Sequence, residues 1–146
     1  MKHTVAFLPS LILLVIARLF SACECEELSP VTPEGTPDPF LVTLASGSLD
    51  TDIFMSVNFN KNIDTTSVVA GISVLVEGLS SIDLFKQANR IVISGPGTNC
   101  ANGTCRVRIT IKGIGPNAVK SSSGQVLDGD ADGTPGGDYV VELIVD

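Results

Sequence analysis

Four aspartates within eleven residues form the densest group of oxygen ligands in the chain. They are Asp128, Asp130, Asp132 and Asp138, and glycines lie between them. The first three stand at positions one, three and five of a loop with glycine at position six, which is the spacing of calcium-binding loops. Glycine permits the sharp reversal that lets alternate side chains converge. Residues 124–139 therefore carry a candidate calcium site made of these four carboxylates.

The surroundings of this loop do not fit an EF-hand. Position twelve requires a bidentate Glu, yet Tyr139 stands there, and no helical pattern flanks the loop. Two interpretations remain open. A cation binds the aspartates in another geometry, or the loop is an acidic, well-solvated connection. Carboxylates this close repel one another, so a bound cation would stabilise the loop.

Two cysteines frame a second motif, Cys100-Ala-Asn-Gly-Thr-Cys105. Asn102-Gly103 favours a type I′ hairpin turn, because both positions need positive φ. Cys100 then faces Cys105 across a pair whose Cα atoms lie about 4.5–5.5 Å apart, which a disulfide can span. The sequence therefore predicts a disulfide in an exported protein.

A zinc site at these cysteines is excluded by ligand count, since zinc takes four protein ligands or three plus water. The single histidine, His3, lies near the N-terminus, and Cys25 lies far before Cys100 and Cys105 in the sequence. Cys25 is left unpaired, either inert or able to cross-link to another chain.

Catalysis is not expected. Beyond His3 there is no imidazole base, and no glycine-rich phosphate loop is present. A carboxylate pair could be drawn from Asp50, Asp52 or Asp64, but nothing singles these residues out. The chain has few aromatic side chains that could stack against a sugar ring. Phe54 points away from the apolar face of its strand, so it is either covered by a loop or available to a partner.

The elements that would position these groups are short strands. An apolar period of two runs through residues 53–59, 72–76, 106–112 and 139–145. Such β-branched runs, bounded by Gly, Asn, Asp and Ser, are typical of half-buried antiparallel strands. In the third run Arg106, Arg108 and Lys112 form a solvated basic face. Residues 80–88 are the most helical piece, a turn or two at most. We expect an all-β antiparallel sandwich of about seven strands.

A family resemblance agrees with this fold. The segment Asp52-Ile-Phe-Met-Ser-Val-Asn-Phe-Asn-Lys-Asn-Ile-Asp64, followed by Thr65-Thr-Ser-Val68 and Ile72-Ser-Val74, resembles the first half of a bacterial Ig-like domain. Val119-Lys120, Gly124, Leu127-Asp128 and the strand from Tyr139 are similar to its last third. Domains of this type occur in surface-layer and other cell-envelope proteins. The resemblance implies an Ig-like β-sandwich over residues 40–146 that acts as a binding or spacer module.

Residues 1–22 have the layout of a secretory signal, with Lys2 and His3 before an apolar run over residues 5–16. Twelve helical residues rise about 18 Å, which is short of the ~30 Å hydrocarbon core. A longer helix would bury Arg18, so a permanent membrane span is the weaker interpretation.

The end of this segment, Leu19-Phe20-Ser21-Ala22-Cys23, resembles a bacterial lipoprotein signal. In that family the cysteine becomes the N-terminus and carries the lipid, so the resemblance implies lipidation of Cys23. Ordinary cleavage with secretion is the alternative, and bulky Phe20 fits it less well. The following residues, up to 39, are rich in proline and would form an extended tether at ~3.1 Å per residue.

Removal of residues 1–22 takes away Lys2 and Arg18 and leaves 7 basic and 16 acidic groups, a net charge of −9. Such a chain repels nucleic acid. We therefore expect a non-catalytic lipoprotein of the outer membrane, periplasm or cell surface. It would be a structural, adhesive or protein-binding module for an envelope protein or polysaccharide, with calcium as its candidate ligand. The alternative is a secreted calcium- or carbohydrate-binding module without a lipid anchor.

Overall fold

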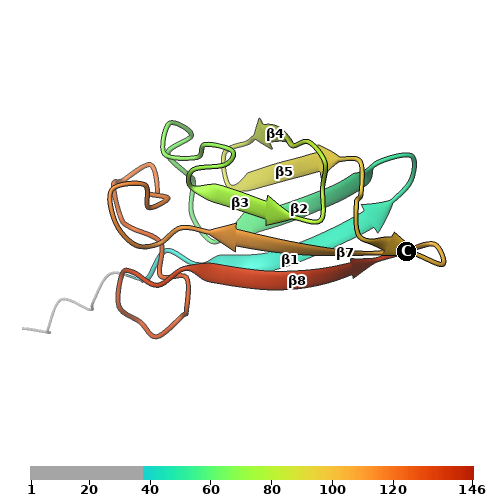
Figure 1. Cartoon of the computed structure of the whole chain (residues 1–146). Coiled ribbons are helices and arrows are strands. Elements are labelled where there is room, and N and C mark those ends of the chain that lie inside the picture. Colours follow the sequence, from blue (N-terminus) through green and yellow to red (C-terminus); the bar gives the residue numbers. More distant parts are fainter. Residues whose placement is uncertain (1–37) are drawn as a thin grey trace, which may run out of the picture. The chain divides into compact units, whose positions relative to one another are not determined.

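The computed structural model describes residues 38–146, which form eight strands and no helix, and therefore no helix that could cross a membrane (Figure 1). The all-β prediction is confirmed, with one strand more than the seven expected. The predicted signal, Cys23, Cys25 and most of the tether lie outside the described residues. The strands are β1 (Val42–Leu49), β2 (Ile53–Phe59), β3 (Val74–Glu77), β4 (Asp83–Lys86), β5 (Arg90–Gly95), β6 (Cys100–Ala101), β7 (Thr104–Ile111) and β8 (Tyr139–Val145).

These strands form two antiparallel sheets. The order in the first sheet is β1-β2-β5-β4. In the second sheet β8 pairs with β7 along one edge, from Cys105 opposite Val145 to Ile111 opposite Tyr139. Since β8 occupies that whole edge, β3 and β6 must share the other edge, at opposite ends of β7. The short β6 is the strand that takes the count to eight.

One hydrophobic core joins the two sheets. Successive side chains of a strand point to opposite faces, so each strand offers alternate residues to the core. Each fully buried aliphatic or aromatic side chain stabilises the fold by about 1.5–3 kcal/mol. The sheets contribute Ile53, Met55, Val57, Phe59, Val74, Ile91, Ile93, Val107, Ile109 and Ile111, and the loops contribute Phe40, Val68, Val119 and Leu127.

The two sheets approach each other closely at one side, where β1 and β8 run side by side (Figure 1). A Cβ atom on Gly47 of β1 would lie 2.6 Å from Cγ1 of Val145 on β8. Glycine at this position therefore lets the first and the last strand pack together.

Residues 80–88 contain strand β4, so the expectation of a helical turn there was wrong. Phe85 pairs with Val92 and Asp83 with Ser94 of β5. Pairing with β5 satisfies the backbone hydrogen-bonding groups of the segment. The free energy gained from this pairing outweighs the local preference of the segment for a helix.

Asp38 and Pro39, the first residues that the structure describes, are hydrogen-bonded to the rest of the domain. The side-chain amides of Asn60 and Gln125 donate to the carbonyls of Pro39, at 2.8 Å, and of Asp38, at 3.0 Å. The Lys61 ammonium also donates to the Asp38 carbonyl. The sequence places these two residues in the tether, yet two loops of the domain hold them.

Candidate functional site

The connection between β7 and β8 holds all four aspartates of the candidate metal site. Asp128 is only 1% exposed. Its Oδ1 accepts from the N–H of Asp132 at 3.2 Å, and its Oδ2 accepts from the N–H of Gly133 at 2.9 Å. Its own N–H donates to the Phe40 carbonyl at 2.9 Å. The buried carboxylate thus folds the loop back on itself and fastens it to the start of the domain.

Asp130 and Asp132 bring their carboxylates to the same place. One oxygen of each of the three side chains lies within 4.8 Å of the others. Asp130 and Asp132 are exposed, and Asp132 also accepts from the N–H of Thr134 at 2.8 Å. Carboxylate oxygens are the ligands that calcium takes. The structure therefore brings together three of the four predicted ligands.

Asp138, the fourth, is engaged elsewhere. Its Oδ2 accepts from the Lys112 ammonium at 2.8 Å, and its Oδ1 accepts from the N–H of Gly113 at 3.0 Å. Burial raises the pKa of Asp138, but the donors of Lys112 and Gly113 outweigh it and hold the pKa below its ordinary value of 3.8. Its role is to tie the start of β8 to the end of β7.

Close backbone approach explains two glycines around this loop. A Cβ atom on Gly129 would collide with the backbone N of Tyr139, and one on Gly113 would collide with the carbonyl of Gly137. Both contacts are with backbone atoms, which cannot turn aside. The loop is therefore packed tightly against the start of β8 and against the residues that follow β7. This packing fixes the backbone that carries the carboxylates.

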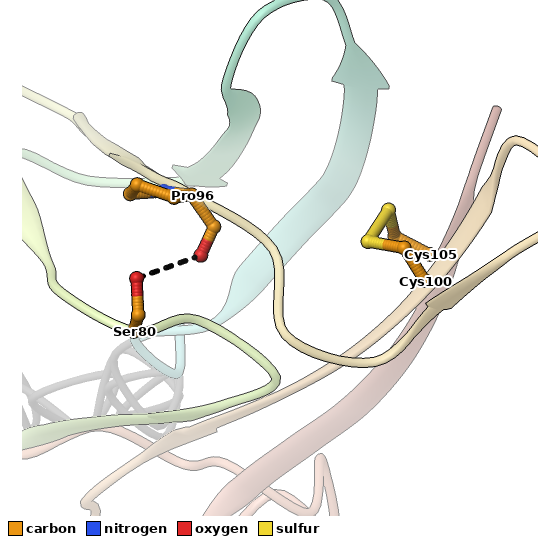
Figure 2. The surroundings of a disulfide bond; sticks show 4 residues. All are labelled: Ser80, Pro96, Cys100 and Cys105. Atoms are coloured by element: carbon orange, nitrogen blue, oxygen red, sulfur yellow. Dashed lines mark hydrogen bonds between the residues drawn. A yellow bond between two sulfur atoms is a disulfide. The ribbon is translucent and has the colours of Figure 1, made fainter.

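The β6–β7 hairpin carries the predicted disulfide between Cys100 and Cys105, whose Cα atoms are 4.0 Å apart (Figure 2). The two cysteines lie directly opposite each other. Asn102 and Gly103 have φ values of 55° and 81°, which are positive at both positions as expected. Both the pairing and the turn are thus confirmed.

The segment leading from β5 to this disulfide is held by the loop before β4. The Ser80 hydroxyl donates to the Pro96 carbonyl at 3.4 Å (Figure 2). The N–H of Ser80 donates to the same carbonyl at 2.9 Å. The N–H of Thr98 donates to the Gly78 carbonyl at 2.8 Å. These bonds connect the hairpin to the rest of the domain.

The outer face of the first sheet exposes two aromatic rings, Phe54 at 45% and Phe85 at 62%. Val92 on β5 pairs with Ser56 of β2 on one side and with Phe85 of β4 on the other. Cross-strand partners share a face, and Phe54 is two residues from Ser56 on the same strand. Phe54, Val92 and Phe85 therefore face outward together. Of the two outcomes expected for Phe54, the structure has the ring available.

A shallow cavity of about 320 Å³ lies on this face over β1, β2 and β5. Phe54, Ser56 and Arg90 contribute to its lining. The hydroxyl oxygen of Ser56 is buried and has no hydrogen-bond partner within residues 38–146. Leaving a buried hydroxyl unpaired costs about 1–3 kcal/mol. Sequence reasoning missed this grouping, because it depends on the register of three strands.

A second cavity, of about 260 Å³, lies between the loop after β2 and the loop after β7. The hydroxyl and the N–H of Thr66 donate to Asp64 in its wall, at 2.6 and 2.9 Å, and hold the pKa of Asp64 below 3.8. The Ser67 hydroxyl accepts from the N–H of Lys120 at 3.0 Å. These groups are used to fix the two loops to each other.

Of the three aspartates considered for a carboxylate pair, Asp64 is separated from Asp50 and Asp52, which lie next to each other. Asp50 and Asp52 precede β2, whereas Asp64 follows it. A seven-residue strand spans about 23 Å, so Asp64 is far from the other two. On the basic face of β7, Arg106 pairs with Glu142 on β8. Exposed pairs of this kind contribute little to stability.

Comparison with known proteins found no match among protein-family models, curated proteins or solved structures. What this chain does must therefore be argued from its residues and their geometry. The features of the described residues that bear on function are the aspartate loop, the order of the strands and the outer face of the first sheet.

Proposed function

We propose that the chain is a cell-envelope lipoprotein with a non-catalytic Ig-like module. The observation that carries the module is the order of the strands. Constant-type immunoglobulin domains have strands A-B-E-D in one sheet and C-F-G in the other. The sheets β1-β2-β5-β4 and β3-β7-β8 follow the same order once the two-residue β6 is set apart. This agreement supports an Ig-like sandwich over residues 40–146.

The anchor in this proposal is lipid on Cys23, supported by the sequence Leu19-Phe20-Ser21-Ala22-Cys23. A proline-rich tether would follow and end at the junction of Asp38 and Pro39. Because Asp38 and Pro39 are hydrogen-bonded to two loops of the domain, the tether would join the module at a fixed point. The module would then act at the outer membrane, in the periplasm or at the cell surface as a structural, adhesive or protein-binding unit.

Calcium is the ligand we propose for the aspartate loop. Asp128, Asp130 and Asp132 would supply its oxygen ligands, and the ion would pin the connection between β7 and β8. The second candidate function is a secreted calcium- or carbohydrate-binding module without lipid. The exposed rings on the outer face of the first sheet favour carbohydrate as the ligand of such a module.

The anchor is tested by cell fractionation of the wild-type chain and a Cys23→Ser variant. The wild type is expected in the membrane fraction as a processed chain. The variant should be either soluble or an unprocessed precursor that still carries residues 1–22, because no cysteine remains at the lipidation position. Cys25→Ser is the matched control and should fractionate like the wild type. Membrane association of a Cys23→Ser chain that has lost residues 1–22 would contradict the proposal.

A further inference from the structure

We propose that the outer face of the first sheet binds an uncharged glycan chain. This inference rests on the proposed envelope function and names the chemical class of its partner. It is carried by an exposed aromatic strip, by hydroxyl and guanidinium groups beside that strip, and by the charge of the face.

The aromatic strip runs diagonally over three strands. Val92 is the direct cross-strand partner of Phe85 and the diagonal neighbour of Phe54, within reach of an aromatic side chain. With strands about 4.8 Å apart and a rise of about 3.4 Å per residue, the two Phe Cα atoms are ~12 Å apart. The C–H faces of sugar rings carry partial positive charge and pack against the negative face of an aromatic ring. The two rings thus offer platforms that a short oligosaccharide bridges.

Polar groups lie along the strip where sugar hydroxyls would reach. Ser46 and Ser56 line the cavity next to Phe54, and Ser46 is the exposed one of the two. Arg90 donates through Nε to Gln87 at 2.9 Å. Its terminal N–H groups have no hydrogen-bond partner in the same part of the chain and remain free to donate. A sugar hydroxyl both donates and accepts, so it can pair with the Ser46 hydroxyl and with the guanidinium.

The charge of the face selects an uncharged chain. Among the outward positions of β1, β2, β5 and β4, only Arg90 and Asp83 are charged, so the face is neutral overall. The whole chain is acidic, with a net charge of −7, and would repel a polyanion such as nucleic acid or an acidic polysaccharide. A neutral glycan meets the rings and the hydroxyls without that repulsion.

The test uses the full-length chain in a detergent without sugar groups. Saturation-transfer NMR and calorimetric titration are run with hexasaccharides of β-1,4-linked glucose, of β-1,4-linked N-acetylglucosamine and of α-1,4-linked glucose. At least one is expected to bind. Phe54→Ala and Phe85→Ala should each weaken that binding about tenfold, the loss expected for an aromatic contact. Ile144→Ala is the matched control, because Ile144 is 63% exposed on the other sheet.

Ser46→Ala separates binding from folding. Ser46 is exposed, so the thermal midpoint should stay the same while glycan binding weakens. Failure of the wild type to bind any of the three probes would overturn the inference. So would a dimer in sedimentation that Phe85→Ala dissociates, because a second copy would then cover this face. Neither result bears on lipid at Cys23, so the proposed function is tested separately.

Discussion

The aspartates of the β7–β8 connection have different roles because their environments differ. Asp128 is buried and already satisfied by the N–H groups of Asp132 and Gly133, so it shapes the loop with or without an ion. The Asp130 carboxylate accepts no hydrogen bond within residues 38–146, so the loop does not need it for its conformation. Asp138 is paired with Lys112. The sequence spacing grouped the first three carboxylates, which lie close together in the structure, but it could not reveal that a lysine would engage the fourth.

Calcium at this loop is expected to raise the thermal midpoint of unfolding, because a ligand that binds the native state alone stabilises it by about 2.7 kcal/mol at a hundredfold excess over Kd. Asp130→Ala should abolish the calcium effect and leave the midpoint in chelator unchanged. Asp83→Ala, at an exposed aspartate of β4, should retain the full shift. No change of the wild-type midpoint between chelator and millimolar calcium would contradict the site.

The ion pair of Asp138 and Lys112 predicts a pH dependence. The pKa of Asp138 in the folded state lies below 3.8, so its stabilisation is present above that pH and is lost as pH falls through the folded-state pKa. At pH 7, Asp138→Asn should cost about 1–2 kcal/mol, after allowing for partial exposure of the pair. Urea unfolding from pH 7 to pH 2 should show this difference shrinking toward zero. A difference that is independent of pH would contradict the role of the charge.

At the scale of elements, alternation predicted some strands well and others not at all. Strand β2 has the predicted bounds, and β7 and β8 lie where the period of two is clearest. Strand β1 is mostly exposed and rich in Ser and Gly, and β5 carries the continuous apolar run Ile91-Val92-Ile93, so neither shows a clean alternation. Strand β4 exists only through its pairing with β5. One-strand patterns cannot reveal such partners, and the grouping of Phe54 with Phe85 on one face was missed for the same reason.

The disulfide is expected to stabilise the β6–β7 hairpin more than the rest of the domain. Closing so short a loop restricts the unfolded chain and contributes about 2 kcal/mol on the chain-entropy model. Replacing both Cys100 and Cys105 with Ser should therefore lower the free energy of unfolding by that amount, measured by urea denaturation. Hydrogen exchange should accelerate first at residues 100–106, while β2 and β5 stay protected. Faster exchange spread evenly over both sheets would argue against a local role.

The whole molecule, as proposed, combines a lipid anchor expected from the sequence with the all-β domain of residues 38–146. Composition and periodicity predicted an all-β chain with two apolar faces, and the structure has them in one core. The order of the strands required the structure, because it depends on pairings between segments far apart in the chain. That order supports the Ig-like resemblance, and the junction at Asp38 and Pro39 gives the proposed tether its point of attachment.

Lipid on the proposed envelope protein is measured by mass spectrometry of the N-terminal peptide of the mature protein. The expectation is that this peptide begins at Cys23 and carries the mass of lipid chains on that residue. A mature peptide with an unmodified residue 23 would contradict it and leave the secreted module as the better description.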